Sequence, residues 1–393
     1  EISCSLVGSE MCIRDRSRMN PQAQYGADVI MRANYALEHG TEALSMCVRK
    51  AVNEMLGSLA EDAGIRREDV FQVCVVGNTC MHHLFLGISP ASLVHAPYTP
   101  AVSERLVLNA GDYGLAVQER AELIMLSDIA GYVGADTCGC LLAIRQDQQE
   151  EISLMIDIGT NGEMVLGNRE RMVTCSTAAG PAFEGAKIEC GMRGAAGAVD
   201  HVKYEDGKWN YTTVGNKPAV GLCGSGLIDL VAGLLDAGML DENGVLRSGQ
   251  EKQGVFILVP PERGGNERGV YLTQKDLGEV QLAKAAIAAG IQMLMERLGI
   301  TEDDICSVYI AGAFGNYMDP VSAGKIGLLP ATLVKKVKPV GNAAGEGAKI
   351  ALVNEKEMLE MDELVRKIEF VELAASADFQ DHFIDELGFE TGE

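Results

Sequence analysis

The sequence predicts an α/β protein made of two related halves. Apolar runs rich in β-branched residues end in glycine-rich turns, and long helical patterns separate these runs. The same order occurs twice: a long helix, a strand that ends in VVGNT or YIAGAFGN, a further strand, and a glycine-studded helix start, IAGYVGAD or VGNAAGEG. A duplicated α/β domain is the simplest explanation, and a chance similarity between common α/β units is the alternative.

Composition limits the classes of function. The 393 residues suffice for two domains, and 47% hydrophobic with 23% charged residues is typical of a globular protein. With 56 acidic against 33 basic side chains the net charge is -23, which repels nucleic acids and anionic membranes, so neither is an expected partner. The 11 cysteines form no disulfide framework and no C-x-x-C pair, which favours a reduced, cytoplasmic location.

Residues 1–19 differ from the rest of the chain. They show neither helical nor strand periodicity, and they lack the zones of a signal peptide. The string SLVGSEMCIRDR is similar to a translated sequencing adaptor. We therefore expect a non-native leader over 1–19, with native sequence from about Asn20 and more of it upstream, and a targeting signal is the weaker alternative.

The first half is predicted to begin with a helix and to continue with two strand–helix units. Apolar residues recur at spacings of three and four over Tyr25–Leu59, where Gly57 interrupts the run. Val70–Val76 has the pattern of a buried parallel strand, and Leu123–Leu126 has the pattern of a second one before the next helix. The polar run Arg145–Glu151 is the predicted domain boundary.

This boundary separates a first domain, residues 20–148, from a second, residues 152–393. The second domain opens with a glycine-rich β-hairpin whose strands are LMIDI and EMVL. The remaining predicted elements are a strand at Arg171–Ser176, a hairpin over Tyr204–Val214, a helix from Gly224 to Ala237, a long helix from a Thr273–Asp276 capping box to Leu298, and strands at Val308–Ile310 and Val337–Val340 before a last helix that ends at Val353.

The turn of the first hairpin has the parts that a nucleotide phosphate requires. Gly159 and Gly162 let backbone N–H groups approach phosphate oxygens, and Thr160 and Asn161 add neutral donors. Asp157 is the candidate catalytic residue and Mg²⁺ ligand, because an acidic group can face a polyphosphate only through a metal or a proton. Since the motif is short, a plain hairpin with a solvent-facing aspartate is an equal alternative.

A second glycine-rich segment, Gly312-Ala313-Phe314-Gly315, lies between a strand and a helix, where it could pass beside an adenine ring. Two other glycine clusters fail as nucleotide signatures. GPAFEGAK lacks the ending of a P-loop, and GSG lacks the third glycine of a Rossmann fingerprint. Both remain candidate helix starts that could face a nucleotide.

Five collinear blocks of the second half resemble the reductive activators of corrinoid proteins, which belong to the acetate and sugar kinase/Hsp70/actin (ASKHA) superfamily. The blocks are MIDIGTNGEMVLGN, CSTAAGPAFEGAKI, GLCGSGLIDL, QLAKAAIAAGI and VYIAGAFGNYMDP. Upstream, NPQAQYGADVI, VVGNTCMHHLFLG and IAGYVGADT resemble the middle region of the same family. The resemblance therefore extends from about Asn20 to the C-terminus.

The resemblance implies two RNase H-like lobes that clamp ATP and Mg²⁺, with the first lobe incomplete. Asp157–Gly162 then match the phosphate loop of the second lobe, and Gly312–Phe314 match its adenosine loop. Gln281 and Lys284 are weaker candidates for nucleotide contact, with a solvated helix face as the alternative. The implied activity is ATP-driven reduction of Co(II) to Co(I) in the corrinoid protein of a methyltransferase system, and a homodimer is one expected form of the activator.

The sequence departs from the family pattern in its metal-binding motifs. The C-x₄-C-x₂-C signature of the family's N-terminal [2Fe–2S] domain, the D-x-G-T-T hairpin of the first lobe and a D-x-H-x-x-G corrinoid motif do not occur. We therefore expect the cluster in the full-length protein, the cobalamin on the partner, and no electron transfer by this fragment alone. His82 and His83 are interpreted as packing or capping residues. Two other functions stay open: a small-molecule kinase of the same superfamily, or a nucleotide-gated binding module without turnover.

Overall fold

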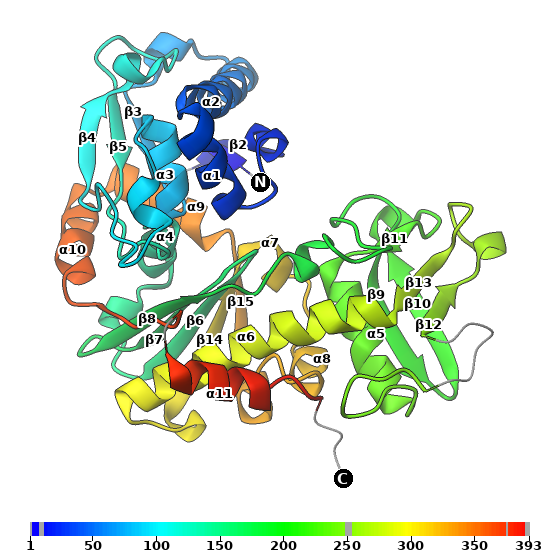
Figure 1. Ribbon diagram of the computed structural model, residues 1–393. Helices are drawn as coiled ribbons and strands as arrows, with labels where there is room; N and C mark the ends of the chain where they lie inside the picture. The colour runs from blue at the N-terminus through cyan, green and yellow to red at the C-terminus, as the bar shows by residue number, and fades with distance from the viewer. Residues whose placement is uncertain (1, 8–11, 248–253, 375, 390–393) are drawn as a thin grey trace. The chain divides into compact units, whose positions relative to one another are not determined.

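The computed structural model describes residues 2–7, 12–247, 254–374 and 376–389, except for the side chains of 12–14 and 313–314. The chain divides into two units (Figure 1). Unit 1 comprises Glu1–Gln149, Arg169–Met172 and Asn342–Phe370, and unit 2 comprises Glu150–Asn168, Val173–Gly341 and Val371–Glu393. The predicted second domain, residues 152–393, therefore contributes residues 169–172 and 342–370 to unit 1. The α/β class is confirmed.

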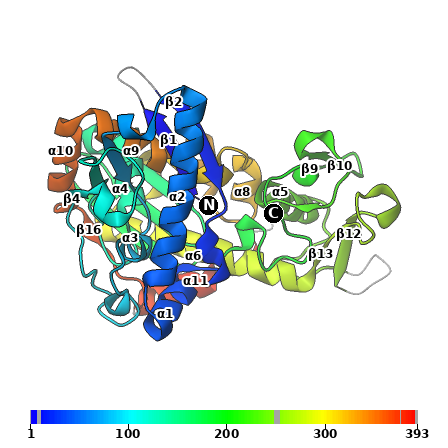
Figure 2. The same cartoon turned by 90° about the horizontal axis from the view of Figure 1, so that it is seen from above.

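Unit 1 begins with a hairpin of β1 (Ile2–Val7) and β2 (Cys12–Arg18) that packs beside α2 (Glu42–Ala63), as Figure 2 shows. Arg16 pairs with Asp62 of α2, and Arg18 pairs with Glu54 of the same helix. Residues 2–7 and 12–18 form strands although their sequence lacks strand periodicity, and they pair with each other and contact α2. The non-native origin of this segment stays a prediction.

The helix predicted over Tyr25–Leu59 is two helices, α1 (Val29–His39) and α2. Gly40, at φ 83°, ends α1 in a backbone conformation that favours glycine. Gly57, the predicted interruption, lies inside α2, where the guanidinium of Arg67 occupies the space that a Cβ would need. The position of the break was therefore predicted wrongly.

A small sheet and four further helices complete unit 1. Strand β3 (Gln72–Val75) pairs in parallel with β5 (Glu122–Met125), as predicted, and β4 (Leu106–Asn109) pairs antiparallel to β5. The helices are α3 (Thr79–Leu86), α4 (Ala135–Ile144), α9 (Ala343–Val353) and α10 (Glu355–Val365), and the short β16 (Glu369–Phe370) follows. Helices α4 and α9 pack backbone to backbone at Gly139 and Gly347.

The main sheet of unit 2 has the strand order β15-β14-β6-β7-β8. Strands β6 (Ile152–Ile158) and β7 (Gly162–Gly167) form the predicted antiparallel hairpin, and β14 (Ile305–Ala311) pairs in parallel with β6 and with β15 (Val337–Gly341). Figure 1 shows α6 (Gln274–Leu298) along this sheet, with α11 (Ala377–Asp385) beside the helix. The remaining strand of this sheet is β8 (Met172–Thr177). The predicted Thr273–Asp276 capping box is present.

The rest of unit 2 contains two smaller sheets. Strands β9 (Ala198–Glu205) and β10 (Lys208–Thr213) form the predicted hairpin, with Asp206 and Gly207 at positive φ in its turn. The other elements are β11 (Gly221–Leu222), α5 (Gly224–Asp236), β12 (Val255–Val259), β13 (Val270–Thr273), α7 (Gly312–Gly315) and α8 (Pro320–Lys325). Strands β12 and β13 were not predicted.

The two halves repeat one connection in detail. The long helices α2 and α6 both end at a left-handed glycine, Gly64 and Gly299, each with φ 69°. A 3₁₀ turn follows each glycine, and the carboxylates of Asp69 and Asp304 accept backbone N–H groups at 3.0 and 2.8 Å before β3 and β14 begin. The two halves therefore share this local connection, and the internal duplication stays a prediction.

None of the helices within the described residues is long and apolar enough to cross a membrane.

Candidate functional site

The turn between β6 and β7 holds five of the predicted site residues. Asp157 is half-buried at the end of β6, where it lies opposite Glu163 of β7. The N–H of Gly159 donates to the carbonyl of Asn161 at 2.9 Å, which closes the turn. This N–H is therefore already engaged, whereas the sequence analysis expected it to face a phosphate.

Thr160 contacts the GPAFEGAK loop, which lacks the ending of a P-loop and is predicted to be a helix start that could face a nucleotide. Its hydroxyl donates to Oε1 of Glu184 at 2.7 Å, and its carbonyl accepts the N–H of Gly180 at 2.8 Å. Glu184 thus brings a second carboxylate to the turn that already carries Asp157. Sequence reasoning missed Glu184, and the only signal was the position of its glycine-rich block directly after β8.

Gly162 has a packing role in the structure. It is buried, and a Cβ at this position would lie 2.9 Å from Oγ1 of Thr177 and 3.2 Å from Cγ1 of Ile287 on α6. Its small size lets the helix approach the hairpin closely. A contact between Gly162 and a nucleotide stays a prediction.

Gly312 brings the second predicted loop to the same edge of the sheet. Parallel pairing sets Ala311 of β14 beside Asp157, and Gly312 follows at φ 87°. A Cβ on Gly312 would lie 2.9 Å from Oδ1 of Asp157. Gly315 packs against Ile310, and the side chains of the predicted site residues Ala313 and Phe314 lie outside the described part of the structure.

We expect Gly312→Ala to lower the free energy of unfolding by about 2 kcal/mol or more, from left-handed backbone strain plus displacement of the Asp157 carboxylate. Gly299→Ala is the matched control, since Gly299 also has positive φ but has open space around it. Urea unfolding followed by fluorescence of the single Trp209 measures both. Equal losses for the two variants would show that the contact with Asp157 is unimportant.

Gln281 and Lys284 contact the C-terminal segment of unit 2. The amide nitrogen of Gln281 donates to the carbonyl of Leu387 at 2.9 Å. The side chain of Lys284 is only 1% exposed, its ammonium group donates to the carbonyl of Gly388, and it lies 5.7 Å from the ring centroid of Phe389. A solvated helix face is therefore wrong for Lys284, while its contact with a nucleotide stays a prediction.

Apart from the exposed Cys306, the cysteines with described side chains are buried or half-buried. Burial raises the pKa of Cys74 and of Cys80 to about 12, so both thiols stay protonated at neutral pH. Among the described residues, no group of three or more His, Cys, Asp or Glu side chains could hold a metal ion. The part of the chain that the structure describes therefore does not fit an iron–sulfur cluster. Asp157 and Glu184 both contribute carboxylate oxygens at the β6–β7 hairpin, which is the type of ligand that Mg²⁺ prefers.

Comparison with known proteins gives two family matches along the chain. Residues 151–393 match the C-terminal domain of RACo, the ASKHA domain, and residues 4–149 match the RACo middle region. A solved structure of a reductive activator for corrinoid, iron–sulfur protein is similar with a TM-score of 0.87 and 37% identity, covering 96% of this chain and 62% of that one.

Two curated relatives are also similar over most of this chain. The corrinoid activation enzyme RamQ of Eubacterium limosum is 34% identical over 96% of this chain and 66% of its own length. The [Co(II) methylated amine-specific corrinoid protein] reductase of Methanosarcina barkeri is 27% identical over 93% of this chain and 71% of its own length. The chain thus spans about two thirds of the length of these relatives.

Proposed function

This chain belongs to the RACo family, and from that premise we propose that it is the ATP-binding portion of an enzyme that reactivates a corrinoid protein by driving Co(II) to Co(I) reduction for a methyltransferase. The match of residues 151–393 to an ASKHA domain supports the predicted fold type. One structural observation carries the nucleotide part: Asp157 and Gly312 meet at the carboxyl edge of the main sheet, where parallel strands commonly present ligand-binding loops.

Each residue of this edge has a distinct task in the proposal. Asp157 and Glu184 would hold a Mg²⁺ that is bound with ATP, and this metal would supply the positive charge that neutralises the phosphates. The absent side chain of Gly312 leaves space beside the Asp157 carboxylate for a phosphate oxygen. Because Glu184 holds the Thr160 hydroxyl, the turn keeps one conformation before the nucleotide arrives, which lowers the cost of binding.

The reduction itself needs groups beyond those described here. The described residues offer no ligand set for a cluster, so no electron-transfer step is assigned to this chain. The chain would use nucleotide binding to favour one of two conformations. This shift can affect a bound partner only if the partner has a different affinity for each conformation. The names of the relatives point to a corrinoid protein as that partner.

The test is calorimetric titration of the chain with Mg-ATP, followed by an assay with a corrinoid protein and a chemical reductant. We expect Asp157→Asn to weaken Mg-ATP binding at least about tenfold, or 1.4 kcal/mol, by loss of a metal ligand. Asp303→Asn, at an exposed aspartate of unit 2, is the matched control. Growth of the Co(I) absorption band should require ATP.

Three results would contradict the proposal in separable ways. Unchanged Mg-ATP affinity in Asp157→Asn would contradict the assignment of Mg-ATP binding to the carboxyl edge of the main sheet. ATP binding without hydrolysis would indicate a gated binding module, and phosphate transfer to a small acid or sugar would indicate a kinase.

A further inference from the structure

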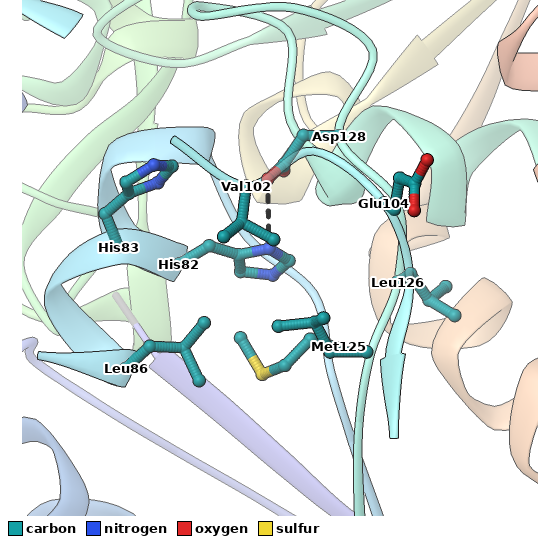
Figure 3. Close-up of a pocket in the computed structure, with 9 residues that line it drawn as sticks. His82, His83, Leu86, Val102, Glu104, Met125, Leu126 and Asp128 are labelled. Atoms are coloured by element: carbon teal, nitrogen blue, oxygen red, sulfur yellow. Dashed lines mark ion pairs between the residues drawn. The ribbon is translucent and has the colours of Figure 1, made fainter. Parts of the chain in front are cut away.

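The pocket shown in Figure 3 belongs to the packing of unit 1. His82 of α3 lies in it, and Nδ1 of His82 is 3.3 Å from Oδ2 of Asp128. The adjacent His83 donates from Nδ1 to the Thr79 carbonyl at 2.8 Å, and its Nε2 accepts the N–H of Ala101 at 3.0 Å. The volume left in the pocket, about 10 Å³, suffices for roughly one water molecule. This pocket therefore has no space for a nucleotide base.

Tyr317 of unit 2 is an exposed aromatic residue beside the predicted adenosine loop. It lies two residues after α7, in the connection to α8, and it is 63% exposed. Within the described residues, its side chain takes part in no hydrogen bond, ion pair or ring contact. Single exposed apolar side chains are common, so exposure alone assigns no role to the ring.

The backbone on both sides of Tyr317 is held in place. Asn316 packs against Gly341 at the end of β15, where a Cβ on Gly341 would lie 3.1 Å from Nδ2 of Asn316. On the other side, Met318 is buried in the core of unit 2, and the carboxylate of Asp319 caps α8. The ring of Tyr317 therefore projects from a fixed stretch of chain, which lowers the entropy cost of a contact with a ligand.

This stretch lies at the carboxyl edge of the main sheet. Strands β6, β14 and β15 are parallel neighbours, with Asp157 near the end of β6, Gly312 after β14 and Gly341 at the end of β15. Neighbouring strands are about 4.8 Å apart, so the ends of β6 and β15 are separated by about 10 Å. A nucleoside triphosphate can span this separation. With its phosphates at Asp157, a nucleotide that extends past Gly312 would bring its base to the end of β15, where Asn316 places Tyr317.

We propose that the ring of Tyr317 stacks on the base of the bound nucleotide. The inference rests on the proposed function, and it assigns a contact to the part of the ligand that Asp157 and Glu184 do not reach. A stacked ring adds affinity without adding charge, which suits a chain whose net charge of -23 repels phosphate. Because every base has a flat face, Tyr317 would favour a nucleotide over a polyphosphate that has no base.

The experiment titrates the whole chain with Mg-ATP by calorimetry and measures competition by Mg-tripolyphosphate, which lacks the base. We expect Tyr317→Ala to weaken Mg-ATP binding by roughly tenfold, the effect of one lost base stack, and to leave the tripolyphosphate affinity unchanged. Tyr317→Phe keeps the ring and should bind both as the wild type does. Tyr211→Ala, at a tyrosine of β10 that is 39% exposed, is the matched control.

A fluorescent analogue tests the stack directly. The triphosphate of 2-aminopurine riboside loses fluorescence when its base is stacked. We expect this loss on binding to the wild type and to Tyr317→Phe, and a bright bound state with Tyr317→Ala.

The outcomes separate this inference from the proposed function. A wild type that binds neither Mg-ATP nor tripolyphosphate would contradict the proposed function and the stack together. Binding of Mg-ATP with equal affinity by the wild type and Tyr317→Ala would overturn the stack alone. Equal losses of Mg-ATP and tripolyphosphate affinity in Tyr317→Ala would also overturn it, because they would show that Tyr317 supports the phosphate site and not the base.

Discussion

Gly347→Ala is expected to lower the stability of unit 1 by about 2–3 kcal/mol. A Cβ at Gly347 would lie 1.9 Å from the carbonyl oxygen of Gly139, and a Cβ at Gly139 would lie 2.6 Å from that of Ala344. Both obstacles are backbone atoms, so α4 and α9 would have to move apart. Alanine is the better helix former by about 1 kcal/mol, but the steric cost exceeds that gain.

The structure supplies a matched control for Gly347→Ala and determines which measurement can follow unit 1. Gly278 lies within α6 with nothing within 4 Å of its added Cβ, so Gly278→Ala should stabilise the protein by about 0.5–1 kcal/mol. The single tryptophan, Trp209, belongs to unit 2, so its fluorescence does not follow unit 1. Hydrogen exchange of the α4 and α9 amides is the appropriate measurement. Unchanged protection of these amides in Gly347→Ala would contradict the close packing described here.

Lys284→Ala should lower the free energy of unfolding of unit 2 by about 3–5 kcal/mol. The substitution leaves a cavity beside Phe389 and removes the ammonium group that donates to the Gly388 carbonyl. It also removes the positive charge that lies 3.9 Å from the Glu386 carboxylate. Lys284→Met keeps most of the volume and removes the buried charge, so its loss should be within about 1.5 kcal/mol. Urea unfolding monitored by Trp209 fluorescence compares the two.

The same pair of variants tests the predicted nucleotide contact of Lys284. If the ammonium group contacts a phosphate, Lys284→Met will weaken Mg-ATP binding while the protein stays folded. If its role is to hold the C-terminal segment, Lys284→Met will bind Mg-ATP as the wild type does. A stability of Lys284→Ala within 1 kcal/mol of the wild type would contradict the structural role.

Local patterns predicted most of the elements that meet at the carboxyl edge of the main sheet of unit 2. The LMIDI and EMVL strands, the capping box at Thr273 and the YIAGAFGN segment each carry a signal within a few neighbouring residues. Parallel pairing of β6 and β14 then brings Asp157 and Gly312 together. These features were predictable because backbone pairing and glycine geometry depend mainly on local sequence.

Features that depend on distant contacts were not predictable. Glu184 reaches Thr160 across 24 residues, and no pattern in its loop announces that contact. The difference between His82 and His83 depends on Asp128 and Ala101, which lie in other segments. Similarly, Gly40 and Gly57 both interrupt a helical pattern, and only the packing of Arg67 explains why α2 continues through the second.

The attachment of the C-terminal segment to α6 has a consequence for biosynthesis. Gln281 donates to the carbonyl of Leu387, and Lys284 donates to the carbonyl of Gly388. Both acceptors lie about one hundred residues later in the chain. While the chain is being synthesised, α6 emerges before the Gly388 carbonyl and the Phe389 ring that contact Lys284 are available. Unit 2 should therefore complete its folding only after residues 386–389 have left the ribosome. A chain shortened before Glu386 would lack the contacts that Gln281 and Lys284 of α6 make with Leu387 and Gly388.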